Sequence, residues 1–459
     1  MEKGAWAGFG ACVPDNFVGG GGLAESVTHD GVTLTGDPLK ENVDYTFDES
    51  THLLTIKTAG KYTLSGTASS NDFRVKVGDR LVTTLTIDNL TINTYRDEKE
   101  DEAKQDYSPL DFSGAGETTL ILVGANQLTA RIDNPAVFAP LVAEDNDSAI
   151  QLIIRGDGSL VAKGGDNWPG IGNTGSAKIR IEGGNITAKG GYAAAGIGGS
   201  WGFWFDSIVI TGGRVVATGG AWANNDIGCG YAPSKKPNHG TNREHAISIE
   251  GGVVEAERIY EDTNENTLKK TGGILVQNGE YTVLGDTTLT TNLTIPKGKT
   301  LTVPNGKTIT IEKNGKLEIE KGAQLYVDGT VQGNITGAGK IYYKLNYDLD
   351  GGEWKSYKPE DYYLSGTGLD LPTKENLNKA GYHFLGWKDE TTGEVVEKIP
   401  ANATGIKSVV AQWEKVVPTA TPVPDASGLP KTGDASAPMV WCALGLACLA
   451  GLAAMKRRK

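Results

Sequence analysis

Four copies of one sequence pattern fill the centre of the chain, and they limit its fold more than any other feature. Each copy contains two short apolar stretches, and in three copies a Gly-Gly pair between them leaves room for a tight turn. The apolar residues that recur five positions apart are Ile181 and Ile186, Ile210 and Val215, and Ile249 and Val254. One copy cannot bury its own apolar face, but stacked copies bury a continuous column of Ile, Val and Ala. The pattern therefore predicts a parallel β-helix.

A shorter repeat follows this region, and in it apolar residues also alternate with polar ones, as in a β-strand. Pairs of apolar residues recur every eight residues, most of them separated by a glycine turn, at Leu293/Ile295, Leu301/Val303, Ile309/Ile311, Leu317/Ile319 and Leu325/Val327. One strand and one turn per repeat, with three repeats to a coil, give about 24 residues per coil of a helix. The repeat extends the predicted solenoid to about Lys340.

Short alternating strands also begin upstream, at about Gly31, and are interrupted by Gly, Asn and Asp. Helical periodicity is absent from this half of the chain. We therefore expect an all-β protein whose β-helix spans residues 31–340, while residues 1–30 stay unassigned.

Composition restricts the classes of partner. The chain has 459 residues, 63 of them glycine without a G-x-y period, so it is not collagen. A net charge of −12 argues against nucleic acid or an anionic membrane surface as a partner. The four cysteines, Cys12, Cys229, Cys442 and Cys448, form neither a disulfide framework nor a metal-binding spacing. No cofactor or metal is implied.

Residues 429–459 combine three features in a fixed order. A polar pentapeptide is followed by an uncharged apolar run at 439–455 and by the basic tail 456–459; the pentapeptide is Leu429, Pro430, Lys431, Thr432 and Gly433. As a helix the apolar run would be about 25 Å long, which is sufficient to cross a membrane. The four cations would hold the tail in the cytoplasm. We therefore predict a C-terminal transmembrane helix at 439–455.

This arrangement resembles the LPxTG cell-wall sorting signal of Gram-positive surface proteins, which is the substrate of sortase. The resemblance implies that a sortase cysteine attacks the carbonyl of Thr432 and that Thr432 becomes the covalent link to peptidoglycan. Residues 433–459 would then be discarded. The protein would be localised at the cell wall, with a transient membrane segment. The alternative is an ordinary single-span tail anchor that contains LPKTG by chance.

The N-terminus does not supply the export signal that such an anchor requires. Residues 1–22 lack an apolar run of the length found in signal peptides. We expect the signal peptide to lie upstream of a chain that is truncated or misassigned at its start.

Two further resemblances concern the displayed part of the chain. The segments GKYTLSGT (Gly60–Thr67) and GGYAAAGIGG (Gly190–Gly199) resemble the Gly-rich β-helical surface proteins of Gram-positive gut bacteria, which are often labelled carbohydrate-binding. Residues 341–415, from YKLNYDLDGGEW to VAQW, look like an internalin B-type repeat, which implies a β-grasp-like domain whose Trp and Tyr residues form its core. The Pro/Thr-rich residues 416–428 would be an extended spacer.

Aromatic residues suggest where a glycan could bind. Trp168, Tyr192 and Trp222 lie one to three residues after the second Gly-Gly of successive copies, so stacking should align them along one edge. Trp201 and Trp204 lie in the adjoining loop. The polar neighbours are Asn167, Asn173, Asn224 and Asn225. The alternative is that these rings only cover the open side of the glycine turns.

Catalysis and a purely structural role are the competing functions. Many β-helix proteins cleave polysaccharides with carboxylates that converge on one face. The carboxylates here do not recur at one phase of the repeat, and they are Asp145, Asp147, Asp157, Asp166, Asp206 and Asp226. We therefore expect no enzyme, and instead an adhesin or glycan-binding protein that acts on host or dietary glycans. The third hypothesis is a purely structural role, in which the chain is a stalk that displays a missing upstream domain.

Overall fold

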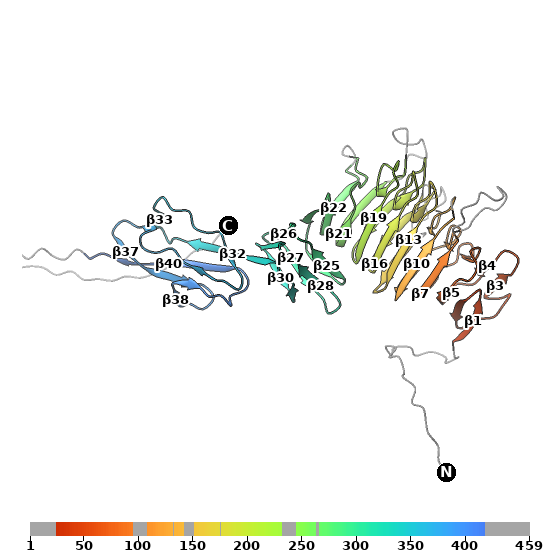
Figure 1. Ribbon diagram of the computed structural model, residues 1–459, viewed down its shortest axis with the longest axis horizontal. Helices are drawn as coiled ribbons and strands as arrows, with labels where there is room; N and C mark the ends of the chain where they lie inside the picture. Colours follow the sequence, from red (N-terminus) through yellow and green to blue (C-terminus); the bar gives the residue numbers. More distant parts are fainter. Residues whose placement is uncertain are drawn as a thin grey trace, which may run out of the picture. The chain divides into compact units, whose positions relative to one another are not determined.

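The computed structural model describes residues 24–94, 108–131, 133–141, 151–174, 176–231, 245–262 and 266–417. Regular structure in these ranges is all β, as Figure 1 shows. No helix within them is long and apolar enough to cross a membrane. The predicted transmembrane helix at 439–455 and the pentapeptide 429–433 lie outside the described residues, as do most of the spacer and residues 1–23.

The first repeat forms three ladders of parallel strands, and we call this region the Gly-Gly stack. The first ladder contains β5 (Gly60–Thr67), β7 (Thr83–Asn93), β9 (Thr118–Val123), β12 (Leu152–Gly156), β15 (Lys178–Ile181), β18 (Ser207–Ile210) and β21 (Ala246–Glu255). The second contains the end of β7, then β10 (Ala125–Thr129), β13 (Ser159–Lys163), β16 (Asn185–Lys189), β19 (Arg214–Thr218), the end of β21 and β22 (Leu268–Gln277). The third contains β4 (Leu53–Ile56), β6 (Arg74–Val77), β8 (Leu110–Asp111), β11 (Val137–Phe138), β14 (Ile171–Asn173), β17 (Ile197–Gly199) and β20 (Ile227–Gly228).

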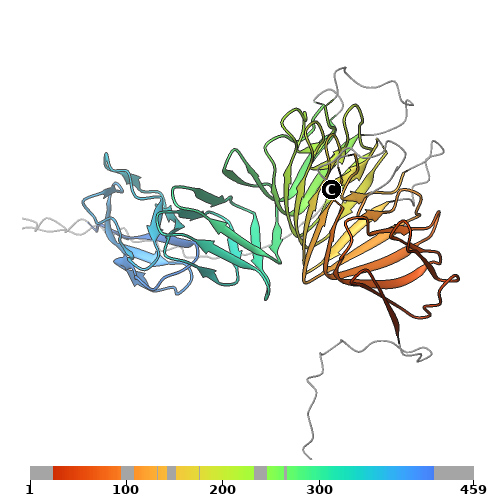
Figure 2. The same cartoon turned by 45° about the vertical axis from the view of Figure 1, so that its right-hand side comes forward.

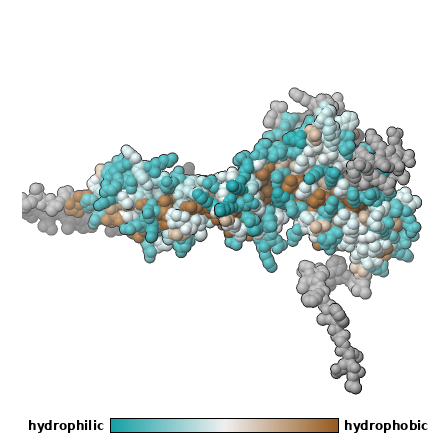
Figure 3. Space-filling model, in the orientation of Figure 1, coloured by the Kyte–Doolittle hydropathy of each residue, from teal (hydrophilic) through white to brown (hydrophobic). Residues whose placement is uncertain are grey.

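The register of the Gly-Gly stack follows the sequence phases. Ile181 pairs with Ile210 and Ile210 with Ile249 in the first ladder, as expected from the repeat. In the second ladder Ile186 pairs with Val215, which pairs with Val254. All six of these side chains are fully buried. Figures 1 and 2 show the paired strands side by side, and Figure 3 shows hydrophobic residues gathered over the strands of this stack.

The Ile-Gly pairs form a column in the third ladder. Gly172 pairs with Gly198, which pairs with Gly228, and Gly198 has a φ of 128°. A Cβ on Gly198 would lie 2.1 Å from the backbone oxygen of Gly228. The glycines recur because neither the backbone conformation nor the space between coils admits a side chain.

The eight-residue repeat forms a second array, residues 287–336. Its strands are β24 (Thr287–Leu289), β25 (Asn292–Ile295), β26 (Thr300–Val303), β27 (Thr308–Ile311), β28 (Lys316–Ile319), β29 (Gln324–Val327), β30 (Thr330–Gln332) and β31 (Ile335–Thr336). Each strand pairs in parallel with the strand three places later, and Leu293 lies opposite Leu317, 24 residues on. Three repeats therefore make one coil, as the sequence predicts.

The two arrays are joined through β23 (Glu280–Val283). This strand pairs antiparallel with β22 of the Gly-Gly stack and parallel with β26 of the eight-residue array. Backbone hydrogen bonds therefore run without interruption from one array into the other.

The N-terminal strands depart from the predicted parallel arrangement. β1 (Glu25–His29) pairs antiparallel with β2 (Val32–Gly36), β2 pairs antiparallel with β5, and β3 (Tyr45–Asp48) pairs antiparallel with β4. The prediction of parallel strands from Gly31 is wrong here. The turns of the β1–β2 and β3–β4 hairpins are too short for crossovers, and β2 pairs antiparallel with β5 across a longer segment that contains β3 and β4. These hairpins cover an edge that the stack would otherwise leave unpaired.

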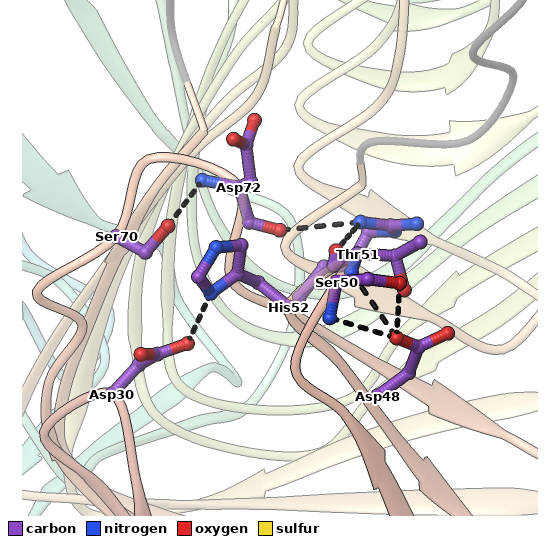
Figure 4. A network of polar contacts seen from close by, with 8 residues as sticks. Asp30, Asp48, Ser50, Thr51, His52, Ser70 and Asp72 are labelled. Carbon is purple, nitrogen blue, oxygen red and sulfur yellow. Dashed lines mark hydrogen bonds and ion pairs between the residues drawn. The ribbon is translucent and has the colours of Figure 1, made fainter.

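A polar network, shown in Figure 4, links the turns of these first strands. His52 Nδ1 lies 2.7 Å from Asp30 Oδ2. Asp48 Oδ1 accepts hydrogen bonds from the backbone N–H and the hydroxyl of Ser50, at 2.9 Å and 2.6 Å. These bonds from Ser50 lower the pKa of Asp48, because they favour the charged carboxylate. Arg74 donates to the backbone oxygens of Thr51 and Asp72.

Residues 340–415 form the C-terminal module. Its first strand, β32 (Lys340–Asp348), pairs with β29 and then with β34 (Tyr362–Leu364) and β40 (Lys407–Lys415). The remaining strands are β33 (Glu353–Trp354), β35 (Leu369–Asp370), β36 (Leu377–Asn378), β37 (Tyr382–Asp389), β38 (Val395–Val396) and β39 (Lys398–Ile399). Trp387 is fully buried, and its indole N–H donates to the backbone oxygen of Pro372 at 2.7 Å. This ring forms the core of the module, as the sequence reading expects.

The glycine column generates a stability prediction. Gly198→Ala should lower the free energy of unfolding by about 2 to 5 kcal/mol, because it combines a disfavoured backbone conformation with overlap between coils. Gly306→Ala is the control, since Gly306 has a φ of 73° but no atom within 4 Å of the added Cβ. Thermal unfolding followed by circular dichroism measures both variants. Equal melting temperatures for the two would show that close stacking of the coils is not the cause.

Candidate glycan-binding surface

The predicted aromatic residues lie on loops that leave the second ladder of the Gly-Gly stack. Trp168 follows β13, Tyr192 follows β16 and Trp222 follows β19. Backbone bonds connect the loops from coil to coil: the N–H of Gly191 donates to the oxygen of Trp168, and the N–H of Trp222 donates to that of Tyr192, both at 2.9 Å. The loops therefore stack in register, because they start and end on stacked strands.

Two rings of these loops and one from the loop after β20 (Ile227–Gly228) lie next to one another, and we call them the aromatic row. The row consists of Tyr192, Trp222 and Tyr231. The ring centroids of Tyr192 and Trp222 are 5.2 Å apart, and those of Trp222 and Tyr231 are 6.0 Å apart. Tyr192 is 49% exposed and Trp222 is 57% exposed. The structure thus brings two of the predicted residues together on the surface.

Tyr231 was missed by the sequence reading, and it completes the row. It comes three residues after Gly228, at the end of the third Ile-Gly copy, and its backbone N–H donates to the oxygen of Ala193 at 2.7 Å. The same position in the preceding copy, three residues after Gly198, is Trp201, so the repeat itself carries a signal for an aromatic residue here. A search for aromatic residues just beyond each Ile-Gly pair would have found it.

Trp201 lies on the loop beside the row and is 55% exposed. Its backbone N–H donates to the oxygen of Asn167 at 2.9 Å, and the N–H of Gly202 donates to the oxygen of Tyr231 at 2.8 Å. Backbone hydrogen bonds therefore join the loop that carries Trp201 to Asn167 on one side and to Tyr231 of the aromatic row on the other.

The other two tryptophans do not lie where the sequence suggests. Trp204 is only 7% exposed, and its ring lies 5.3 Å from each of the rings of His245 and Tyr260. The prediction that Trp204 belongs to the binding surface is wrong, because His245 and Tyr260, which come from a later part of the chain, cover its ring. Trp168 is half-buried with its ring edge against Phe138, at 5.8 Å. Its face is therefore only partly available.

The polar neighbours also divide into available and buried residues. Asn224 is exposed, and Asn167 and Asn225 are half-buried. Asn173 is fully buried, where its amide donates to the oxygen of Pro140 at 2.9 Å and its Oδ1 accepts from the N–H of Ser176. Asn173 therefore holds the backbone in place and is removed from the candidate surface.

One buried ion pair holds the loop that carries Trp222. The carboxylate of Asp226 is 3% exposed and accepts from the N–H groups of Gly219, Glu257 and Arg258, at 2.7 to 2.9 Å. It also accepts from the Arg258 guanidinium at 2.8 Å. The same guanidinium donates to the backbone oxygens of Ala223 and Gly220. Arg258, which comes after β21, thus binds both sides of the loop 219–226 and fixes the position of Trp222.

The carboxylates weighed for catalysis occupy different environments. Asp206 and Asp226 are buried, with Lys178 lying 3.6 Å from Asp206. Asp157 and Asp166 are exposed, and Asp145 and Asp147 lie outside the described residues. Within the described ranges, no group of three or more His, Cys, Asp or Glu side chains is arranged to hold a metal ion. Cys229 is buried, and burial raises the pKa of its thiol to about 11.

Comparison with models of protein families, with curated proteins and with solved structures found no match to this chain.

The Asp226–Arg258 pair generates the second prediction. Arg258→Lys should lower the free energy of unfolding by about 1 to 3 kcal/mol, since an ammonium cannot reach the carboxylate and two carbonyls together and the guanidinium is partly screened by solvent. Hydrogen–deuterium exchange should become faster in residues 219–226. Arg214→Lys is the matched control, because Arg214 pairs with one carboxylate, Glu255, whose side chain is 45% exposed, and this pair should contribute little. Unchanged exchange in residues 219–226 of Arg258→Lys would refute the bracing role.

Proposed function

We propose that this chain is a sortase-anchored surface protein of a Gram-positive bacterium that binds glycans through the aromatic row. The observation that carries the proposal is the row itself: three adjacent rings on stacked loops, two of them about half exposed. Monomeric proteins seldom expose neighbouring large rings unless they take part in binding.

We infer further that the parallel strands between the N-terminal hairpins and about Lys340 fold as a β-helix solenoid of the right-handed kind. The i-to-i+3 strand pairing in both arrays supports this reading. The internalin B-type identity of residues 341–415 and the spacer at 416–428 rest on the sequence resemblance.

The chemistry of the row suits a sugar ring. The C–H groups on one face of a pyranose can lie against an aromatic ring, and its hydroxyls need donors and acceptors at the margin. The exposed Asn224, two residues after Trp222, offers an amide donor and an amide acceptor, while the Oδ1 of the half-buried Asn225 already accepts from Cys229 Sγ at 2.9 Å. Because Arg258 and the backbone bonds hold the loops in place, little conformational entropy is lost on binding.

The anchoring step is the one that the resemblance of the tail to the LPxTG sorting signal implies. The sortase thiolate attacks the carbonyl carbon of Thr432, the Thr432–Gly433 amide bond breaks, and the amine of Gly433 leaves with a proton. A peptidoglycan amine then attacks the resulting thioester, forms a new amide with Thr432 and releases the enzyme thiol. The protein would thereby remain on the cell surface after residues 433–459 depart.

The binding proposal predicts the effect of removing one ring. Trp222→Ala should weaken binding to the glycans and mucins that the full-length protein recognises by at least about tenfold, since it removes the central ring of the row. Tyr382→Ala, which removes an exposed ring from the C-terminal module, should leave binding unchanged. A glycan and mucin array measures both variants and the parent protein.

Other outcomes of the array distinguish the competing functions. If Trp222→Ala binds as well as the parent protein, or if the parent protein binds no glycan, the glycan proposal is wrong and the stalk is favoured. Shortening of a bound polysaccharide during the assay would instead favour the enzyme.

The anchoring proposal predicts the effect of changing the tail. Thr432→Ala, expressed behind an export signal in a Gram-positive host that has sortase, should move the protein from the cell wall to the membrane or medium. Lys431→Ala changes the variable position of the LPxTG pattern and should keep the protein attached. Muramidase digestion of isolated walls followed by immunoblotting measures the attached fraction. Wall attachment of Thr432→Ala would contradict the proposal.

A further inference from the structure

A second concave surface lies at the opposite end of the strands that lead to the aromatic row. It is a groove of about 900 Å³, lined by residues of both arrays. From the Gly-Gly stack it takes Ser159, Asn185 and Arg214, which are the first residues of β13, β16 and β19. The row lies beyond the last residues of the same strands, roughly 16 Å away along each strand.

The register of the stack arranges one wall of the groove in a line. Ser159 pairs with Asn185, Asn185 with Arg214, and Arg214 with Val253. Neighbouring strands are about 4.8 Å apart, so these four positions extend over roughly 14 Å. A surface of this length fits several units of a chain better than one small molecule.

The other wall comes from β23 and from the first coil of the eight-residue array. Tyr281 contributes its half-buried ring, and its hydroxyl lies 3.4 Å from the backbone oxygen of Thr294. Burial, and then the nearby Glu255 carboxylate, raise the pKa of Tyr281, so the hydroxyl remains a donor at neutral pH. Asn292 and Asn314 are exposed on this wall.

The charged residues of the groove are Arg214, Glu255 and the exposed Asp157, so its net charge is negative and disfavours an anionic ligand. Arg214 donates to Glu255 Oε2 at 2.8 Å, which leaves the guanidinium without an excess charge for an anionic ligand. The three asparagine amides each offer a donor and an acceptor, as hydroxyl groups require. An extended peptide usually binds by adding a strand to a free sheet edge. On one wall β13 and β16 already have partners on both sides, and on the other wall only the four residues of β25 (Asn292–Ile295), which pairs with β28 alone, could pair with a peptide.

We propose that this groove, between the first residues of β13, β16 and β19 and the wall formed by Tyr281, Asn292 and Asn314, binds an uncharged linear oligosaccharide. The site is separate from the aromatic row and does not depend on it. A protein with both sites would hold a long glycan at two places, or two glycans at once.

Calorimetric titration of the full-length protein tests the groove with named probes. Cellohexaose and xylohexaose are the uncharged linear probes, and a hexamer of galacturonic acid is the charged one. The variant Asn185→Ala/Asn292→Ala should bind the uncharged hexamer about tenfold more weakly than the parent, because both walls lose an amide. Both positions are exposed, so circular dichroism spectra should not change.

Two controls separate this proposal from that of the row. Lys189→Ala removes an exposed side chain at the far end of β16 and should leave the affinity unchanged. Trp222→Ala should also keep the affinity of the groove within about twofold. Loss of cellohexaose and xylohexaose binding in Trp222→Ala but not in the asparagine variant would overturn the groove and leave the row standing. Binding of the galacturonate hexamer alone, or of no hexamer, would overturn the assignment of an uncharged ligand.

Discussion

In-register stacking of parallel strands is the constraint on which the rest of this structure depends. Strands about 4.8 Å apart place like residues directly above one another, so an apolar position in one coil requires an apolar position in the next. The columns through Ile181 and Ile186 satisfy this requirement. Each fully buried Ile or Leu contributes about 1.5 to 3 kcal/mol, and the contribution is lost if the register slips. The glycine column through Gly198 has the same cause, because neighbouring strands there approach so closely that only a residue without a side chain fits.

Stacking also explains why function would gather at the ends of the strands. Interior positions are occupied by the core, and the loops that leave one ladder are held by the loops above and below them. The backbone bond from Trp222 to Tyr192 is one such contact, and the bonds of Arg258 to the preceding loop are another. A ring at a loop position therefore acquires a ring neighbour at a distance fixed by the stack.

A stack of strands has open edges, and the chain covers part of the edge at each end with a different structure. At the N-terminal side the hairpins of β1, β2 and β3 replace parallel pairing by antiparallel pairing. At the C-terminal side β32 pairs with the last coil through its first residues and with β40 through its later ones. The eight-residue array and the C-terminal module therefore share one strand, which leaves no flexible linker at that point. Unpaired edges would invite association between copies of the chain.

The sequence by itself determined the all-β class, the phases of both repeats and the three-strand coil, because these follow from local periodicity and from the identity of stacked residues. It also placed Tyr192 and Trp222 on neighbouring loops. Only the tertiary structure decided which rings are available: Trp204 is covered by His245 and Tyr260, and Tyr231, from the loop after β20, lies beside Trp222, from the loop after β19. The groove beside Arg214 is likewise invisible in the sequence, since its walls come from two arrays with different periods. Burial and concavity depend on contacts between residues distant in the chain, and no local pattern records them.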